Sequence, residues 1–123
     1  MTHILIVEDE ERITSFVRRG LTSSGYLVSS AATGLEALEI LGGENIDLVL
    51  LDITMPRMDG YEVRKQIRSN PQAKNLPVVM ISGKDGFFDK VRGRMAGSTG
   101  YVTKPFGPET LMKALETYLV PEA

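Results

Sequence analysis

The chain has 123 residues, of which 42% are hydrophobic and 24% are charged, and its formal net charge at pH 7 is −2. This is the composition of one folded domain, and the slight negative charge excludes an overall basic footprint for nucleic acid. The absence of cysteine and the presence of a single histidine exclude a disulfide framework and a thiolate or histidine metal cluster. No apolar run is long enough to span a bilayer and no basic segment precedes the first apolar run, so we expect a cytoplasmic protein.

Short aliphatic runs alternate along the chain with segments of helical periodicity. Five runs rich in branched residues predict strands, at residues 3–7, 27–31, 46–51, 78–81 and 101–103. Apolar residues three and four positions apart predict five helices, marked by Ile13, Phe16, Val17 and Leu21, by Leu35, Leu38 and Leu41, by Val63 and Ile67, by Phe88, Val91 and Met95, and by Leu111, Leu115 and Leu119. We expect Gly25 to end the first helix in the left-handed conformation. The alternation predicts an α/β fold, a doubly wound five-stranded parallel sheet flanked by five helices, in one domain of residues 1–123.

Polar side chains that could take part in binding or catalysis follow four of the predicted strands. Glu8 and Asp9 follow the first strand, Asp52 the third, Ser82 the fourth and Lys104 the fifth. Each of these has an ordinary explanation by itself, since strands often end in polar residues. In an open α/β sheet, however, ligands bind outside the carboxyl ends of the strands. Three carboxylates, one hydroxyl and one ammonium group converging on that edge therefore indicate a functional site.

The carboxylates suit a hard metal ion. Mg²⁺ prefers one or two carboxylates together with water and phosphate oxygens. Asp9 and Asp52 can supply the carboxylates, Glu8 can act directly or through water, and a loop carbonyl such as that of Thr54 can add a further ligand. The pattern predicts a magnesium site at this edge.

The remaining groups fit phosphoryl transfer, in which a protein chiefly positions the reactants and neutralises charge. The Lys104 ammonium group suits one phosphoryl oxygen and the Ser82 hydroxyl can donate a hydrogen bond to another. The nucleophile would be a carboxylate, which forms an acyl phosphate.

Across essentially its whole length, the sequence resembles the response-regulator receiver domain of two-component signalling. The matching segments are residues 4–10 (ILIVEDE), 50–60 (LLDITMPRMDG), 78–82 (VVMIS) and 104–106 (KPF). The resemblance implies that Asp52 is the phosphorylated aspartate and that Glu8 and Asp9 are the acidic pair, with Asp9 as a direct metal ligand. It also implies that the backbone carbonyl of Thr54 binds the metal, which is Mg²⁺, with Mn²⁺ as a substitute.

The same resemblance implies how phosphorylation is read. Ser82 matches the hydroxyl that moves to the phosphate, Lys104 the lysine of the family pattern, and Tyr101 the aromatic residue that swings inward when the hydroxyl moves. The phosphoryl donor is then a histidine kinase or a phosphotransfer protein. We expect the output, a downstream protein or a second copy of the chain, to bind the face made by the fourth helix, the fifth strand and the fifth helix. The chain itself is expected to bind neither nucleic acid nor membrane.

The resemblance describes a signalling protein whose only reactions are self-phosphorylation from small donors and self-dephosphorylation, and not an enzyme. Residues 84–106 are similar to stand-alone receivers of type IV pilus and twitching-motility systems, whereas the first half is similar to receivers of winged-helix transcription factors. The sequence leaves open whether the protein is a stand-alone receiver or carries a further domain.

Two other functional classes compete with the receiver. A phosphatase of the haloacid-dehalogenase type also uses an aspartyl nucleophile after a strand, but it needs a second acid at the position of Thr54. A flavodoxin-like cofactor binder needs a loop that cradles phosphate after the first strand, where residues 8–11 are all acidic. The fold alone does not separate these classes.

Overall fold

The computed structural model describes residues 2–52, 65–67, 69, 76–82, 100–103 and 107–118. Its strands are β1 (His3–Val7), β2 (Leu27–Ala31), β3 (Leu48–Asp52), β4 (Val78–Ser82) and β5 (Gly100–Thr103). Its helices are α1 (Glu11–Ser23), α2 (Gly34–Gly43) and α5 (Pro108–Tyr118). Among the described helices, none combines the length and the apolar character that crossing a membrane requires.

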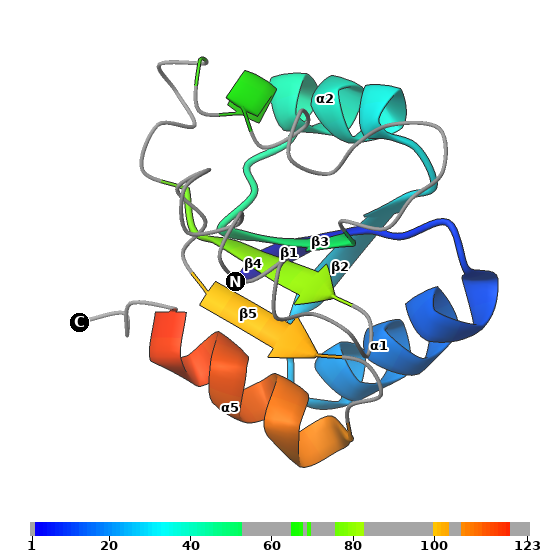
Figure 1. Ribbon diagram of the computed structural model, residues 1–123, viewed down its shortest axis with the longest axis vertical. Helices are drawn as coiled ribbons and strands as arrows, with labels where there is room; N and C mark the ends of the chain where they lie inside the picture. The colour runs from blue at the N-terminus through cyan, green and yellow to red at the C-terminus, as the bar shows by residue number, and fades with distance from the viewer. Residues whose placement is uncertain are drawn as a thin grey trace.

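The strands form one parallel sheet in the order β2-β1-β3-β4-β5. Figure 1 shows α1 and α5 on one face of this sheet and α2 on the other, which gives three layers. After β1 the chain moves outward to β2 and then returns to the other side of β1 to form β3. The strand order therefore reverses between β1 and β3, and ligands of such sheets bind at this reversal. The predicted doubly wound parallel sheet is confirmed.

The central strands are buried on both faces, and their side chains alternate between two cores. Ile6 and Leu50 belong to the core under α1 and α5, whereas Val7 and Leu51 belong to the core under α2. All four side chains have no exposed surface. Burial of one such side chain contributes about 1.5–3 kcal/mol, so the aliphatic runs fix the centre of the sheet and the positions of the residues that follow them.

Local signals set the ends of two helices. Thr33 precedes α2, and its hydroxyl accepts a hydrogen bond of 3.2 Å from the backbone N–H of Glu36. Gly25 has a φ of 92°, which confirms the left-handed conformation expected after α1. The backbone N–H of Tyr26 then donates to the carbonyl oxygen of Leu21 at 3.1 Å, which closes the helix end and turns the chain into β2.

Several elements differ from the sequence-based expectation in their bounds or in the face that they bury. β3 begins two residues later than predicted, at Leu48, and β5 begins one residue earlier, at Gly100. Leu35 is 67% exposed because α2 packs through Gly34 and Ala37, which are one and two residues away in sequence and therefore on a different face of the helix. Of the third predicted helix, residues 65–67 and 69 are helical in the described part. The fourth predicted helix lies outside the described residues.

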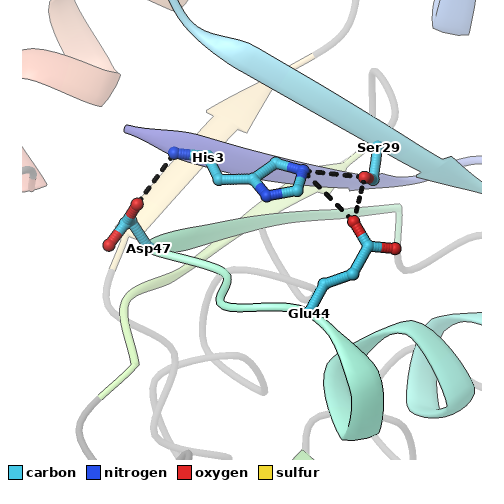
Figure 2. A network of polar contacts seen from close by, with 4 residues as sticks. All are labelled: His3, Ser29, Glu44 and Asp47. Carbon is cyan, nitrogen blue, oxygen red and sulfur yellow. Dashed lines mark hydrogen bonds and ion pairs between the residues drawn. The ribbon is translucent and has the colours of Figure 1, made fainter. Parts of the chain in front are cut away.

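The single histidine has a structural role at the amino-terminal edge of the sheet. His3 Nε2 lies 2.7 Å from Ser29 Oγ and 3.5 Å from Glu44 Oε1, and Ser29 Oγ donates to the same Glu44 oxygen at 2.8 Å. Because a hydroxyl has one hydrogen, Ser29 accepts from His3, and Nε2 therefore carries a proton. The His3 backbone N–H also donates to Asp47 Oδ2 at 2.8 Å (Figure 2). The network joins β1, β2 and the segment before β3 at the edge opposite the predicted site.

Candidate functional site

Three carboxylates meet at the carboxyl edge of the sheet, as the sequence predicts. Val7 of β1 is in register with Leu51 of β3, so the next residues, Glu8 and Asp52, stand beside each other across two neighbouring strands. Asp9 follows Glu8. One carboxylate oxygen from each of the three residues lies within 4.8 Å of the others. In the part of the chain that the structure describes, this is the group of acidic side chains arranged to hold a metal ion.

The three carboxylates have different environments. Glu8 and Asp52 are almost fully buried, with 3% and 1% of their surface exposed, whereas Asp9 is exposed. The Glu8 backbone N–H donates to the Ala31 carbonyl oxygen at 2.9 Å, which attaches the start of this loop to β2. Its carboxylate Oε1 accepts a hydrogen bond of 3.1 Å from the backbone N–H of Glu10. The turn after β1 thus holds the Glu8 side chain in place.

The electrostatics of this cluster favour a cation. Negative groups brought this close repel one another, and burial of Glu8 and Asp52 removes much of the water that would screen them. All the donor atoms are carboxylate oxygens, which suit hard ions such as Mg²⁺, Ca²⁺ or Mn²⁺ better than soft ones. The donor set therefore fits the predicted metal.

A groove of about 400 Å³ opens beside Glu8 and Asp9 of the cluster, between the beginning of α1 and the end of β2. Its lining includes Glu8, Asp9, Thr14 and Ser30, and the Arg18 guanidinium group donates a hydrogen bond to the Ser30 hydroxyl on its wall. The groove gives solvent and ligands access to the exposed side of the cluster. The pairing of Arg18 with β2 was not predicted from the sequence.

The other predicted site residues are described in part or not at all. Asp52 is in register with Ile81, so the backbone of Ser82 ends β4 at the same edge, and Ser82 is in turn in register with Thr103. The backbone of Tyr101 pairs with Met80 within the sheet. Thr54 and Lys104 lie outside the described residues, as do the side chains of Ser82 and Tyr101. Their predicted roles stay predictions.

Comparison with known proteins decides the family. Residues 4–116 match the model of the response regulator receiver domain. The chain belongs to this family. This receiver domain is therefore a two-component signalling protein with an acidic pocket rather than an enzyme, and the phosphatase and flavodoxin-like alternatives do not hold. Receiver domains act together with histidine kinases.

Relatives of two kinds are similar to this receiver domain. Protein PilG of Pseudomonas aeruginosa is 36% identical over 116 residues, which cover 94% of this chain and 86% of PilG. A probable transcriptional regulator, ycf27 of Cyanidium caldarium, is 40% identical over 117 residues, which cover 95% of this chain. The receiver domain spans about half the length of the latter kind of relative, 46% in the case of ycf27.

Solved structures agree with the fold and with the acidic pocket. The chemotaxis protein CheY4 of Vibrio cholerae is 37% identical with a TM-score of 0.92, and the match covers 97% of this chain and 99% of CheY4. The receiver domain of the sensor histidine kinase PA1611 from Pseudomonas aeruginosa is 27% identical with a TM-score of 0.87, and covers 95% of this chain and 96% of its own. That structure holds a magnesium ion coordinated in its active site cleft. The Glu8, Asp9 and Asp52 cluster is consistent with such a site.

Proposed function

We propose that this receiver domain accepts a phosphoryl group on Asp52 from a histidine kinase or a phosphotransfer protein, in a reaction that depends on Mg²⁺. The observation that carries the proposal is the position of Asp52, buried at the end of β3 with two further carboxylates within 4.8 Å. A carboxylate oxygen of Asp52 attacks the phosphorus atom, a bond between oxygen and phosphorus forms, and the bond from phosphorus to the donor's imidazole nitrogen breaks. The product is an acyl phosphate.

The acidic cluster would hold the metal. Asp9 and Asp52 are the proposed direct ligands, Glu8 acts directly or through water, and the backbone carbonyl of Thr54 completes the protein's share. The ion, when bound, neutralises charge on the phosphoryl oxygens. Without it, Glu8 and Asp9 would repel an incoming phosphoryl group, and this repulsion supports the metal requirement.

The proposed readout uses three more residues. Lys104 provides a positive charge for a phosphoryl oxygen, and Ser82 donates a hydrogen bond to another. As Ser82 moves, Tyr101 turns inward, and the change reaches the face formed by the predicted fourth helix, β5 and α5. A downstream protein or a second copy of the chain binds there. We further propose that residues 1–123 form one domain and that it acts in the cytoplasm.

The phosphoacceptor is tested with acetyl phosphate and MgCl₂, followed by intact-mass measurement. The wild type should gain one phosphoryl group, EDTA should prevent the gain, and Asp52→Asn should abolish it. Asp9→Ala should slow the reaction because a site with few protein ligands loses one of them. The matched control is Glu39→Gln on the exposed face of α2, which should react as the wild type does. Phosphorylation of Asp52→Asn at the wild-type rate would disprove the assignment.

A further inference from the structure

The groove beside Glu8 and Asp9 has an arginine on its wall. α1 packs against β2 along this side of the sheet, and the Arg18 guanidinium group of α1 donates a hydrogen bond to the Ser30 hydroxyl of β2. Both residues line the groove together with Glu8 and Asp9. The arginine and two carboxylates of the proposed metal site therefore share one open space.

The contact with Ser30 sets how far the positive charge stands from the acidic cluster. Ser30 is in register with Ile6, which precedes Glu8 by two residues. With about 3.3 Å per residue along a strand and about 4.8 Å between strands, the Ser30 and Glu8 backbones are about 8 Å apart. The guanidinium charge is therefore held on the order of 10 Å from the carboxylates, which is about the Debye length at 0.1 M salt.

The charge of Arg18 is not taken up by an ion pair. Within the described part of the chain, the arginine forms none, and the partner that it does contact, the Ser30 hydroxyl, is neutral. Among the described residues that line the groove, Arg18 is the basic one, and Glu8, Asp9 and Glu11 are acidic. The field of the arginine therefore extends to whatever occupies the acidic end of the groove.

We propose that Arg18 sets the affinity of the acidic cluster for its metal ion. The inference rests on the proposed function, because the ion concerned is the one that phosphoryl transfer to Asp52 requires. In the metal-free protein, the arginine offsets part of the repulsion among the carboxylates. Once the ion is bound, the same positive charge opposes it, so the arginine weakens binding. Arg18 thus shifts the range of free Mg²⁺ over which the site fills to higher concentrations.

Binding of Mn²⁺ to the full chain tests the proposal, with no phosphodonor present. The electron paramagnetic resonance signal of the free ion reports the bound fraction, and Mg²⁺ is then added as a competitor. Arg18→Gln should bind either ion about threefold more tightly, or better, at low ionic strength, because a charge that repels a divalent cation at this range is removed. The gain should shrink in about 0.5 M KCl, where salt screens that repulsion.

Two further variants separate the charge of Arg18 from its structural contact and from net charge. Arg18→Lys keeps the charge and loses the planar fork of donors, so it should bind the ions as the wild type does. Arg19→Gln changes the net charge as Arg18→Gln does, but Arg19 lines a separate groove between α1 and α5, and its variant should also bind as the wild type does. Both arginines are exposed, and thermal unfolding in EDTA should show that all three variants fold.

Three results would overturn the proposal. The first is an Arg18→Gln variant with the affinity of the wild type, and the second is a gain of the same size in Arg19→Gln. The third is an Arg18→Lys variant that binds as tightly as Arg18→Gln, since the effect would then come from the lost contact with Ser30. A wild type that binds neither ion would overturn the proposed metal requirement as well, so failure of this inference alone is distinguishable from failure of the proposed function.

Discussion

Asp52→Asn removes one charge from the acidic cluster and keeps the shape of the side chain. Glu8 and Asp52 are both almost fully buried, and their carboxylate oxygens lie within 4.8 Å. At an effective dielectric constant of about 20, two unit charges at that distance repel by about 3 kcal/mol. The substitution also weakens contacts that Asp52 makes as a charged acceptor, at a cost of about 1–2 kcal/mol. Without metal we therefore expect Asp52→Asn to unfold with a free energy equal to the wild type's or about 1–2 kcal/mol higher.

Magnesium should make the wild type more stable than Asp52→Asn. A ligand present at a hundred times its dissociation constant, and bound only by the folded state, stabilises that state by about 2.7 kcal/mol. An unfolding entropy of about 2.1 cal/mol/K per residue converts this gain into a rise in Tm of about 10 °C for a chain of this length. The asparagine variant lacks one of the proposed ligands, so its Tm should rise by less than about 3 °C.

The assay is thermal unfolding followed by circular dichroism, in EDTA and in MgCl₂, with ionic strength matched by KCl. Glu39→Gln removes an exposed charge far from the cluster and should show the full magnesium shift of the wild type. An equal magnesium shift in Asp52→Asn would refute the assignment of Asp52 as a ligand. A variant several kcal/mol less stable than the wild type in EDTA would refute the reasoning about repulsion.

Two further predictions concern the readout and the opposite edge of the sheet. Beryllofluoride, a mimic of the phosphoryl group, should shift the backbone-amide NMR signals of β5 and α5 as well as those near Asp52; shifts confined to the loops around Asp52 would contradict the proposed output face. Ser29→Ala removes the hydroxyl that joins His3 to Glu44, and should lower the free energy of unfolding in urea by about 1–2 kcal/mol. Ser15→Ala on the exposed surface of α1 is its control, expected within about 0.5 kcal/mol of the wild type, and equal losses in both variants would show that the network does not stabilise the fold.

The sheet and the acidic cluster were predictable because a strand that is buried on both faces appears in the sequence as a continuous aliphatic run. The fully buried stretches of β1 and β3, residues 4–7 and 48–51, are aliphatic throughout, and both stop at carboxylates, so the strand ends and the residues beyond them could be located together. The reversal of strand order then brings Glu8 beside Asp52. The rule that ligands of such sheets bind at this reversal therefore predicts, from the sequence, that Glu8 and Asp52 belong to one site.

Contacts that depend on the packing of particular elements were not predictable. Helical spacing groups Phe16 with its apolar neighbours and Leu35 with Leu38, but spacing does not reveal which part of a helix face another element covers. The hydrogen bond from the Glu10 N–H to Glu8 left no signal, since every residue except proline carries a backbone amide. The pairing of Arg18 with β2 likewise depends on how closely α1 approaches that strand.

The placement of Asp52 within the sheet has a consequence for the timing and reach of the signal. Asp52 is the last residue of β3, a strand paired with β1 on one side and with β4 on the other. Displacing Asp52 would disturb its pairing with Ile81 of β4 and the end of a strand that is held on both sides, so the proposed phosphorylation should leave its position unchanged. On the proposed function, the rearrangement would then be made by groups that approach a stationary negative charge. The lifetime of the proposed acyl phosphate would be set by how easily water reaches one immobile group, and surface residues around the cleft could tune that lifetime without altering the fold.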